Sequence, residues 1–248
     1  IVFGDWSSDV CSSDLETLTS PRPLRLHILR IDLGDDGLEL CTILGGDPDG
    51  DGPAEATLES PLTLASRHGA IGAVNANAFR HLPDASPEER RRGWYAGKAV
   101  DIAGLAAADG TLRSQPDSSL PNLWTDAAGA VRIGEVAEAA TVRHGVAAWI
   151  DHLLADDQVV ARPSNQIHPR TLAGVDATGR IVLLAVADGR QRGVSEGLTL
   201  PEAAEIMRQR GCRHAVNLDG GGSSILVVRP DPNTDQLVTV NRPSDGRP

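Results

Sequence analysis

Short apolar runs separated by turn residues predict a protein built mainly from strands. From Leu24 to Leu33 apolar residues alternate with basic ones, which is the period of a strand with one buried face. An Asp-Gly turn and a second apolar stretch, Leu38 to Ile43, follow this strand. The sequence therefore predicts an opening hairpin.

Further strands are expected along the chain. One is the apolar segment Ala70 to Val74, and shorter ones lie between Lys98 and Arg113 and around Val131 to Ile133. The C-terminal half should contribute four more, at Thr171 to Val175, Ile181 to Ala187, His214 to Leu218 and Ile225 to Val228. The strand at Ile181 to Ala187 is continuously apolar, which predicts a central position in a sheet.

Helices are expected to be few. Ser60 and Pro61 begin a short helix that ends at Gly69, and the charged insert 83–93 suits a surface excursion or a short exposed helix at a rim. Thr199 and Glu202 have the spacing of a capping box, and Gly211 follows the last turn of that helix. The expected fold class is α+β (mixed α/β), with central mixed β-sheets and active-site loops at strand ends.

Length and charge narrow the class of protein. A chain of 248 residues can form one large core, so a single domain is expected over residues 20–242, with a polar tail that frays after Pro230. The formal net charge of −11 disfavours a general nucleic-acid binder, because phosphate backbones are held by basic faces. The longest apolar run, Ile181 to Ala187, is far shorter than the roughly 20 residues that span a bilayer.

The first residues need separate treatment. Gly4 to Leu15 is similar to the in-frame translation of a sequencing adapter, so residues 1–15 are expected not to be native and not to belong to the domain. A signal peptide cannot be recognised from this N-terminus. The cysteines outside this stretch, Cys41 and Cys212, are expected to be buried thiols rather than a disulfide.

The segment 45–55 is acidic and rich in glycine. Asp47, Asp49, Asp51 and Gly52 match the start of a calcium-binding loop, but Leu58 stands where that loop needs a bidentate Glu. A solvated acidic loop is therefore the expected structure. Dependence on a divalent cation such as calcium, held elsewhere by carboxylates, stays open, and the metal ligands are unknown.

The segment Asn217 to Ser224 (NLDGGGSS) carries the clearest chemical signal. It lies between two predicted strands, and its successive glycines let a ligand approach the backbone amides closely. Asp219 could act on a bound substrate there. A Gly-rich turn capped by Asp is the structural alternative, and the missing Gly-Lys-Ser/Thr ending disfavours a nucleotide P-loop.

Other strand ends carry related residues. Asp188-Gly189-Arg190 follows one predicted strand, and His168-Pro169-Arg170-Thr171 begins another. The planar guanidinium of Arg suits bidentate contact with phosphate, although each segment alone could be a salt-bridged turn. Asn75 and Asn77 follow the strand Ala70 to Val74, and their amides can recognise sugar hydroxyls.

These segments together resemble the phosphodiester glycosidase family. Its typical motifs occur here in order, at Asn75 to Phe79, Pro169 to Thr171, Asp188 to Arg190 with Ser195 and Gly197, and Asn217 to Ser224. Ala78 stands where the family usually has Phe. The resemblance covers most of the chain from Leu24 to Val228.

The resemblance implies an enzyme that hydrolyses the glycosidic bond of a sugar-1-phosphodiester, with a sugar such as N-acetylglucosamine, on a glycan or cell-envelope polymer. It implies an extracellular or cell-envelope location. Asp219, Asp188 and Arg170 are the expected catalytic residues, the carboxylates acting on water or the anomeric carbon and the guanidinium on the phosphate. The expected substrate-binding residues are Asn75, Asn77, His168, Thr171, Arg190, Gly220, Gly221, Gly222, Ser223 and Ser224.

Two alternatives remain at this point. One is a glycan-binding module without turnover, and the other is a phosphodiesterase that cuts the phosphorus–oxygen bond. The sequence does not choose between retention and inversion of the anomeric centre, because the separation of the carboxylates is not known from it.

Overall fold

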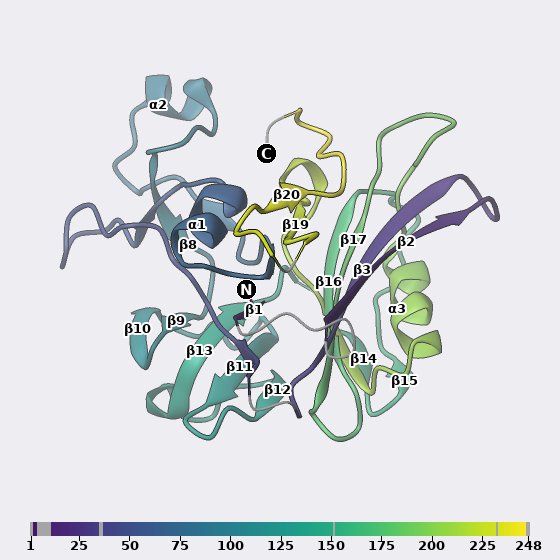
Figure 1. The fold of residues 1–248 in the computed structure, drawn as a ribbon. Coiled ribbons are helices and arrows are strands. Elements are labelled where there is room, and N and C mark those ends of the chain that lie inside the picture. Colours follow the sequence, from purple (N-terminus) through teal and green to yellow (C-terminus); the bar gives the residue numbers. More distant parts are fainter. Residues whose placement is uncertain (1, 4–10, 35–36, 151, 232, 247–248) are drawn as a thin grey trace.

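A seven-stranded antiparallel sheet forms the centre of the computed structural model, which describes residues 2–3, 11–34, 37–150, 152–231 and 233–246 (Figure 1). Its strands lie in the order β15, β14, β18, β16, β17, β3, β2. They span Gln158–Val159, His152–Ala155, His214–Asn217, Arg170–Val175, Ile181–Ala187, Leu24–Asp32 and Cys11–Leu18. β17, the continuously apolar segment, lies inside the sheet between β16 and β3, as its sequence predicts.

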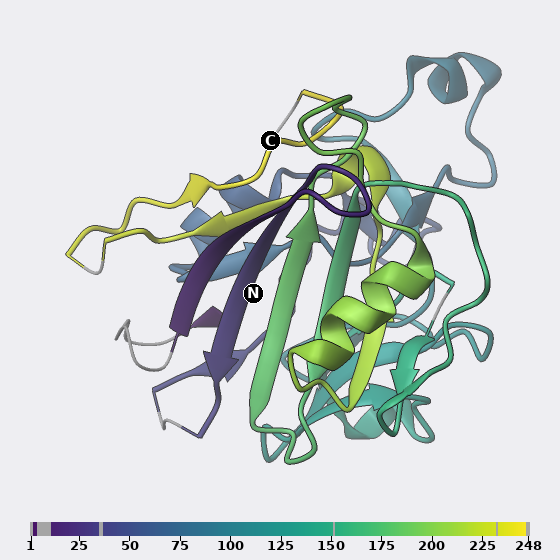
Figure 2. The ribbon, with the colours of Figure 1, turned by 90° about the vertical axis from the view of Figure 1, so that its right-hand side faces the viewer.

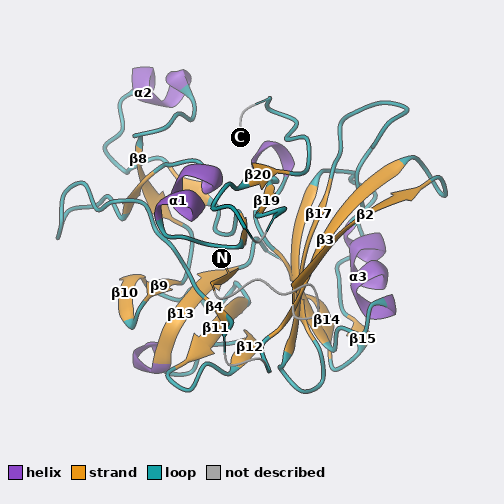
Figure 3. Ribbon diagram, in the orientation of Figure 1, coloured by secondary structure: helices purple, strands orange, loops and turns teal. Residues whose placement is uncertain are grey.

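Three smaller sheets lie on the other side of the molecule from α3, Leu200–Gln209 (Figures 1 and 3). The first contains β9 Ala106–Ala108, β10 Thr111–Ser114, β11 Asn122–Asp126, β12 Val131–Gly134 and β13 Val142–Ala147. The second contains β1 Val2–Phe3, β4 Glu39–Leu40, β6 Gly72–Val74, β19 Leu226–Val228 and β20 Val238–Thr239. The third contains β5 Ala56–Thr57, β7 Phe79–Arg80 and β8 Ala99–Ile102.

Helices are few in the described residues, which confirms the expected fold class. α1 spans Pro61–Arg67, and α2 spans Pro87–Arg92 within the exposed insert. α3 begins with the capping box predicted for Thr199 and Glu202. Figure 2 shows α3 lying across one face of the central sheet. No helix among the described residues is long and apolar enough to cross a membrane.

Side-chain alternation divides the core between the two faces of the central sheet. On β16, Leu172 packs in the cluster that includes Met207 of α3, whereas Ala173 and Val175 pack toward the smaller sheets. This period of two places neighbouring residues of one strand in different layers. It also decides where the functional candidates at the strand ends point.

Some expectations about local structure are wrong. β3 and β4 do not form a hairpin, because β3 pairs with β2 and β17 while β4 pairs with β1. β11 and β13 are strands that the sequence analysis missed. Cys41 and Cys212 are buried thiols that are not joined by a disulfide, as expected. The adapter-like segment includes residues 4–10, which lie outside the described residues, while its remainder enters β2.

Candidate active site

The Gly-rich segment lies where the central sheet meets the sheet of β6 and β19. Beyond the end of β18, the Leu218 amide donates to the Thr171 carbonyl at 2.8 Å, and the Asp219 amide donates to the Ala76 carbonyl at 2.8 Å. The backbone of Asp219 is therefore fixed between two sheets. A short 3₁₀ turn, Gly221–Ser223, follows it.

Two positions of this turn require glycine for geometric reasons. A Cβ on Gly220 would lie 2.9 Å from the Pro169 carbonyl oxygen, which is closer than ordinary packing allows. Gly221 has a φ of 70°, in the left-handed region that favours glycine. The segment that carries Asp219 is thus packed tightly onto the start of β16.

Asn75 joins three parts of the site with one amide group. Its Nδ2 donates to the Asp219 carbonyl at 2.7 Å, and its Oδ1 accepts from Thr171 Oγ1 at 2.7 Å and from the Ile225 amide at 3.1 Å. Thr171 is fully buried. Asn75 and Thr171 therefore hold the segment that carries Asp219 in place.

Asp219 is partly buried and lines a cavity of about 560 Å³. Burial raises the pKa of its carboxyl to about 6, although hydrogen bonds from the Ser223 hydroxyl and the Gly220 amide act in the opposite direction. Such a group is near its titration midpoint close to neutral pH, which suits general acid–base chemistry.

Most walls of this cavity are apolar or aromatic, and its polar groups include four of the predicted site residues, Asn75, Asn77, Asp219 and Ser223. Asn77 donates from Nδ2 to the carbonyls of Ala103 and Leu105, at 3.2 and 2.9 Å. These two bonds fix the amide at the cavity wall. Gly222 also lines the cavity.

Asp188 does not line this cavity. It is 2% exposed, and its Oδ1 accepts from the Arg242 amide at 2.9 Å and from Asn241 Nδ2 at 3.1 Å. His27 Nε2 lies 3.5 Å from its Oδ2. The carboxylate therefore anchors the C-terminal segment to the end of β17.

That anchoring corrects the expectation of a frayed tail. Asn241 is buried, its Oδ1 accepts from the Leu226 amide at 2.8 Å, and its Nδ2 donates to the Ser224 carbonyl at 2.9 Å. Ser224 is itself buried beneath the site, so this predicted binding residue does not reach the cavity surface. The polar composition suggests a solvated tail, but the side chain of the buried Asn241 satisfies two backbone groups and contacts Asp188.

Arg190 lies beside the Gly-rich turn, with a left-handed φ of 59°. A Cβ on Gly221 would lie 3.0 Å from Arg190 Nη2. Arg190 Nη1 donates to Ser244 Oγ at 3.3 Å and lies 3.9 Å from Asp245 Oδ1. The Asp245 carboxylate also approaches Gly222 closely. The structure thus brings Arg190 to the turn but places two tail residues against it.

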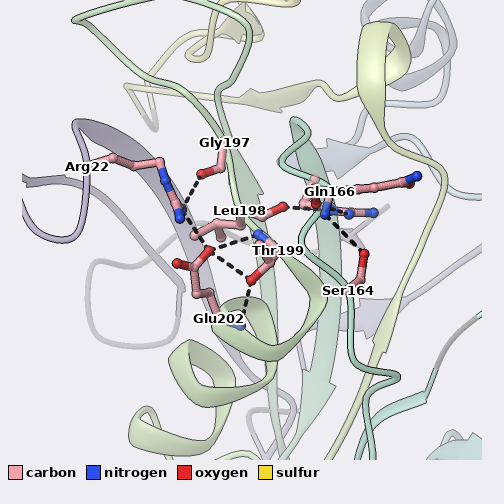
Figure 4. A network of polar contacts seen from close by, with 8 residues as sticks. Arg22, Ser164, Gln166, Gly197, Leu198, Thr199 and Glu202 are labelled. Atoms are coloured by element: carbon pink, nitrogen blue, oxygen red, sulfur yellow. Dashed lines mark hydrogen bonds and ion pairs between the residues drawn. The ribbon is translucent and has the colours of Figure 1, made fainter.

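Arg170 and His168 line a second cavity, of about 420 Å³. Arg170 begins β16 on the same face as Leu172, whereas Thr171 points toward Asn75. Arg170 Nε donates to the Leu198 carbonyl at 3.1 Å, and its Nη2 donates to the Gln166 carbonyl at 3.3 Å. The two acceptor residues, Leu198 and Gln166, are labelled in Figure 4. The predicted site residues are therefore divided between two cavities.

Aromatic and histidine side chains that were not among the predicted site residues also line the first cavity. Trp94 directly follows the exposed insert, stacks on His81 and meets the Phe79 ring edge-on. His144 lines the cavity from β13, and burial is the main cause that lowers its pKa. A strand pattern around Val142–Ala147 was the available signal for His144.

The described residues contain no group of three or more His, Cys, Asp or Glu side chains placed to hold a metal ion. In the acidic loop, Asp47 Oδ1 accepts from the amides of Asp49 and Gly50, at 3.3 and 2.9 Å. Asp49 Oδ2 accepts from the Ala54 amide at 3.2 Å. These carboxylates stabilise turns of an exposed loop.

Known proteins share both sequence and fold with this chain. N-acetylglucosamine-1-phosphodiester alpha-N-acetylglucosaminidase of Mus musculus is 42% identical over 64 residues, which are 26% of this chain and 12% of that protein. The catalytic domain of the zebrafish enzyme of the same name, auto-inhibited by its pro-peptide, superposes with a TM-score of 0.65 and 16% identity, covering 98% of this chain and 80% of that one.

A Burkholderia pseudomallei protein described as exported has the same fold, with a TM-score of 0.57, 18% identity, and coverage of 90% of this chain and 71% of that one. At sequence identities of 16% and 18%, these structural similarities establish the fold alone. A family model for phosphodiester glycosidases matches residues 68–248, which is more than half of the chain. The chain belongs to the phosphodiester glycosidase family.

Proposed function

We propose that this protein hydrolyses the glycosidic bond of a sugar-1-phosphodiester, with an N-acetylglucosamine-like sugar, on a glycan or cell-envelope polymer. The observation that carries the proposal is Asp219, a carboxyl with a pKa of about 6 at the wall of a cavity of about 560 Å³. Family membership supports the same reaction class.

In the proposed reaction, water attacks the anomeric carbon and the bond from that carbon to the phosphate oxygen breaks. The products are the free sugar and a phosphomonoester. Ionised Asp219 accepts a proton from the attacking water and stabilises the positive charge that develops on the sugar. The departing phosphate is already a good leaving group, so the reaction places little demand on a general acid.

The neighbouring residues support this chemistry in different ways. Asn75 holds the backbone of Asp219, and Asn77 lies at the cavity wall for contact with sugar oxygens. Arg190, beside the Gly-rich turn, is the guanidinium that would meet the phosphate. Asp188 and Arg170, both outside the Asp219 cavity, act as positioning residues through their contacts with the tail and the loop backbone.

The natural setting that we propose is extracellular or in the cell envelope. A carbohydrate polymer that carries phosphodiesters suits the proposed chemistry, and its phosphate would be met locally by a basic side chain such as Arg190. The exported description of the Burkholderia pseudomallei protein with the same fold is consistent with this location.

The direct test is release of free N-acetylglucosamine from its 1-phosphate methyl diester, by the wild type and by Asp219→Asn. Release by the wild type that the variant loses supports the proposal. Hydrolysis in ¹⁸O-labelled water should place the label on the sugar. Label on the phosphate would assign a phosphodiesterase instead, and binding without release would indicate a glycan-binding module.

A parallel assay with a chelator tests for a divalent cation. Loss of activity on chelation, restored by calcium, would show that a cation takes part. Unchanged activity would show that the side chains named above act without a divalent cation.

A further inference from the structure

The second cavity lies on the face of the central sheet that carries α3, away from Asp219. Asn217, Arg170 and Trp149 are among the residues that line it. Asn217 ends β18 two residues before Asp219, and Arg170 begins the neighbouring strand. Neighbouring residues at and just beyond the end of β18 therefore line the two cavities, Asn217 the second and Asp219 the first.

A buried acceptor at the wall of this cavity has no protein partner. Asn217 is 1% exposed, its Nδ2 donates to the Trp149 carbonyl at 3.2 Å, and its Oδ1 accepts no hydrogen bond. An unsatisfied buried polar group costs about 1–3 kcal/mol, so such groups usually have a reason to persist. Asn217 lines the cavity, and a turn of its side chain toward the cavity would expose Oδ1 to a ligand hydroxyl that donates to it.

Two large apolar side chains are held in solvent beside this acceptor. The Trp149 amide donates to the Asn217 carbonyl at 2.8 Å, which ties the Trp149 backbone to β18 while the residue stays 36% exposed. Ile150 is 43% exposed and has a φ of 75°, a conformation that β-branched residues rarely adopt. Backbone strain of this kind costs roughly 1–3 kcal/mol and concentrates at ligand sites.

Hydrogen-bonding groups line the same cavity as these apolar side chains. Hydrogen bonds to the carbonyls of Leu198 and Gln166 hold the Arg170 guanidinium in place at the cavity wall. Ser164, whose hydroxyl accepts from the Gln166 amide at 3.2 Å, lines the same cavity. A cavity lined by an aromatic residue and by polar groups fits a ligand with one apolar face and hydroxyls at its edge.

The geometry points to a saccharide-binding subsite in this second cavity, formed around Asn217 and Trp149. Resting on the proposed function, it binds a sugar unit of the glycan whose phosphodiester is cleaved at Asp219. The apolar face of the pyranose packs on the Trp149 ring, and one hydroxyl donates to Asn217 Oδ1. The glycan passes around the strand ends from one cavity to the other.

The test compares a short substrate with long ones. The short substrate is the methyl diester of N-acetylglucosamine-1-phosphate, and the long ones carry chitotriose, maltotriose or mannotriose on the same phosphate. At least one long substrate should have a kcat/KM about tenfold higher than the short one, through a lower KM. Trp149→Ala should remove that advantage, which corresponds to about 1.4 kcal/mol, and leave the short substrate unchanged.

Two control variants keep the result interpretable. Trp149→Phe retains an aromatic face and should keep most of the advantage, while Val159→Ala, an exposed position on β15 that does not line the cavity, should have no effect. Equal kcat/KM for all substrates, or an advantage that survives Trp149→Ala, would overturn the subsite.

Failure of the subsite and failure of the proposed function are distinguishable. If no diester is cleaved, the proposed function fails, and calorimetric titration of the three free trisaccharides still tests the subsite. Binding of one of them by the wild type that Trp149→Ala loses would support it. Absence of binding to a folded wild type, for all three trisaccharides, would exclude it.

Discussion

The Thr171 hydroxyl donates to Asn75 Oδ1 at 2.7 Å, although 96 residues separate the two in sequence. Both residues belong to segments that the sequence analysis selected for ligand binding. In the structure their side chains bind each other and the backbone near Asp219. Their first role is therefore to position the carboxylate.

Replacing Thr171 by Val should test this positioning role. The change keeps the shape but removes the donor, leaving Asn75 Oδ1 with one partner fewer, and should lower the free energy of unfolding by about 1–3 kcal/mol. We expect kcat to fall with little change in KM. Urea unfolding and steady-state kinetics measure the two effects.

Thr171→Ser is the matched control, because it retains the hydroxyl and should keep most of the activity. If Val and Ser variants behaved alike, the hydrogen bond to Asn75 would have no part in holding Asp219. A Val variant that raised KM alone would instead indicate direct contact of Thr171 with the substrate.

Much of the fold could be predicted because its signals are local. β17 and the cap of α3 follow from a continuous apolar run and from the spacing of Thr199 and Glu202. The hairpin expectation for β3 and β4 failed because strand pairing depends on segments distant in sequence. No local pattern could show that β17 would pair with β3.

The candidate site could be predicted only in part, for a similar reason. Sequence motifs bring Asp188, Arg170 and Asp219 to neighbouring strand ends, but the side-chain period of two decides which face each one takes. Arg170 and Thr171 are adjacent in sequence and point to different layers. The role of Asp188 depends on Asn241, which carried no signal in a tail that was expected to fray.

The activity should depend on pH through Asp219. Its pKa is raised to about 6, mainly by burial, and the proposed reaction uses the ionised form. We expect kcat to be nearly constant above pH 7 and to fall about tenfold for each pH unit well below 6. A pH profile of kcat in which activity instead increased below pH 6 would assign Asp219 as a general acid.

The same raised pKa means that ionised Asp219 should lower the free energy of unfolding. Because the folded state binds this proton more tightly than the unfolded state, the protein is most stable below pH 4 with respect to this group and loses that stability as the pH rises through about 6. Asp219→Asn removes the ionisation and should raise the free energy of unfolding at pH 7 by about 2 kcal/mol.

Urea unfolding at pH 7 and at pH 4 measures this difference. The gain from Asp219→Asn should be present at pH 7 and nearly absent at pH 4, where the wild-type carboxyl is largely protonated. An equal gain at both values would show that ionisation is not its cause. A variant that is inactive yet more stable would separate the role of Asp219 in catalysis from any role in folding.

Asp245 should compete with the substrate phosphate for Arg190. Its carboxylate lies 3.9 Å from Arg190 Nη1 and against Gly222, on the turn that follows Asp219. The pair is largely exposed, and such pairs contribute about 0.2–1 kcal/mol, so the competition is weak. We expect Asp245→Asn to lower KM for a phosphodiester roughly two- to fivefold at low salt, with kcat unchanged.

The effect of Asp245→Asn should disappear as salt is raised, because exposed charges are screened. Asp235→Asn is the matched control, since Asp235 lies in the same C-terminal segment but faces Arg229, at 3.7 Å, instead of the Gly-rich turn. If both variants lowered KM equally, the cause would be the net charge of the chain. If neither did, Arg190 would not meet the phosphate, and the anion would have to be bound by other groups near Asp219.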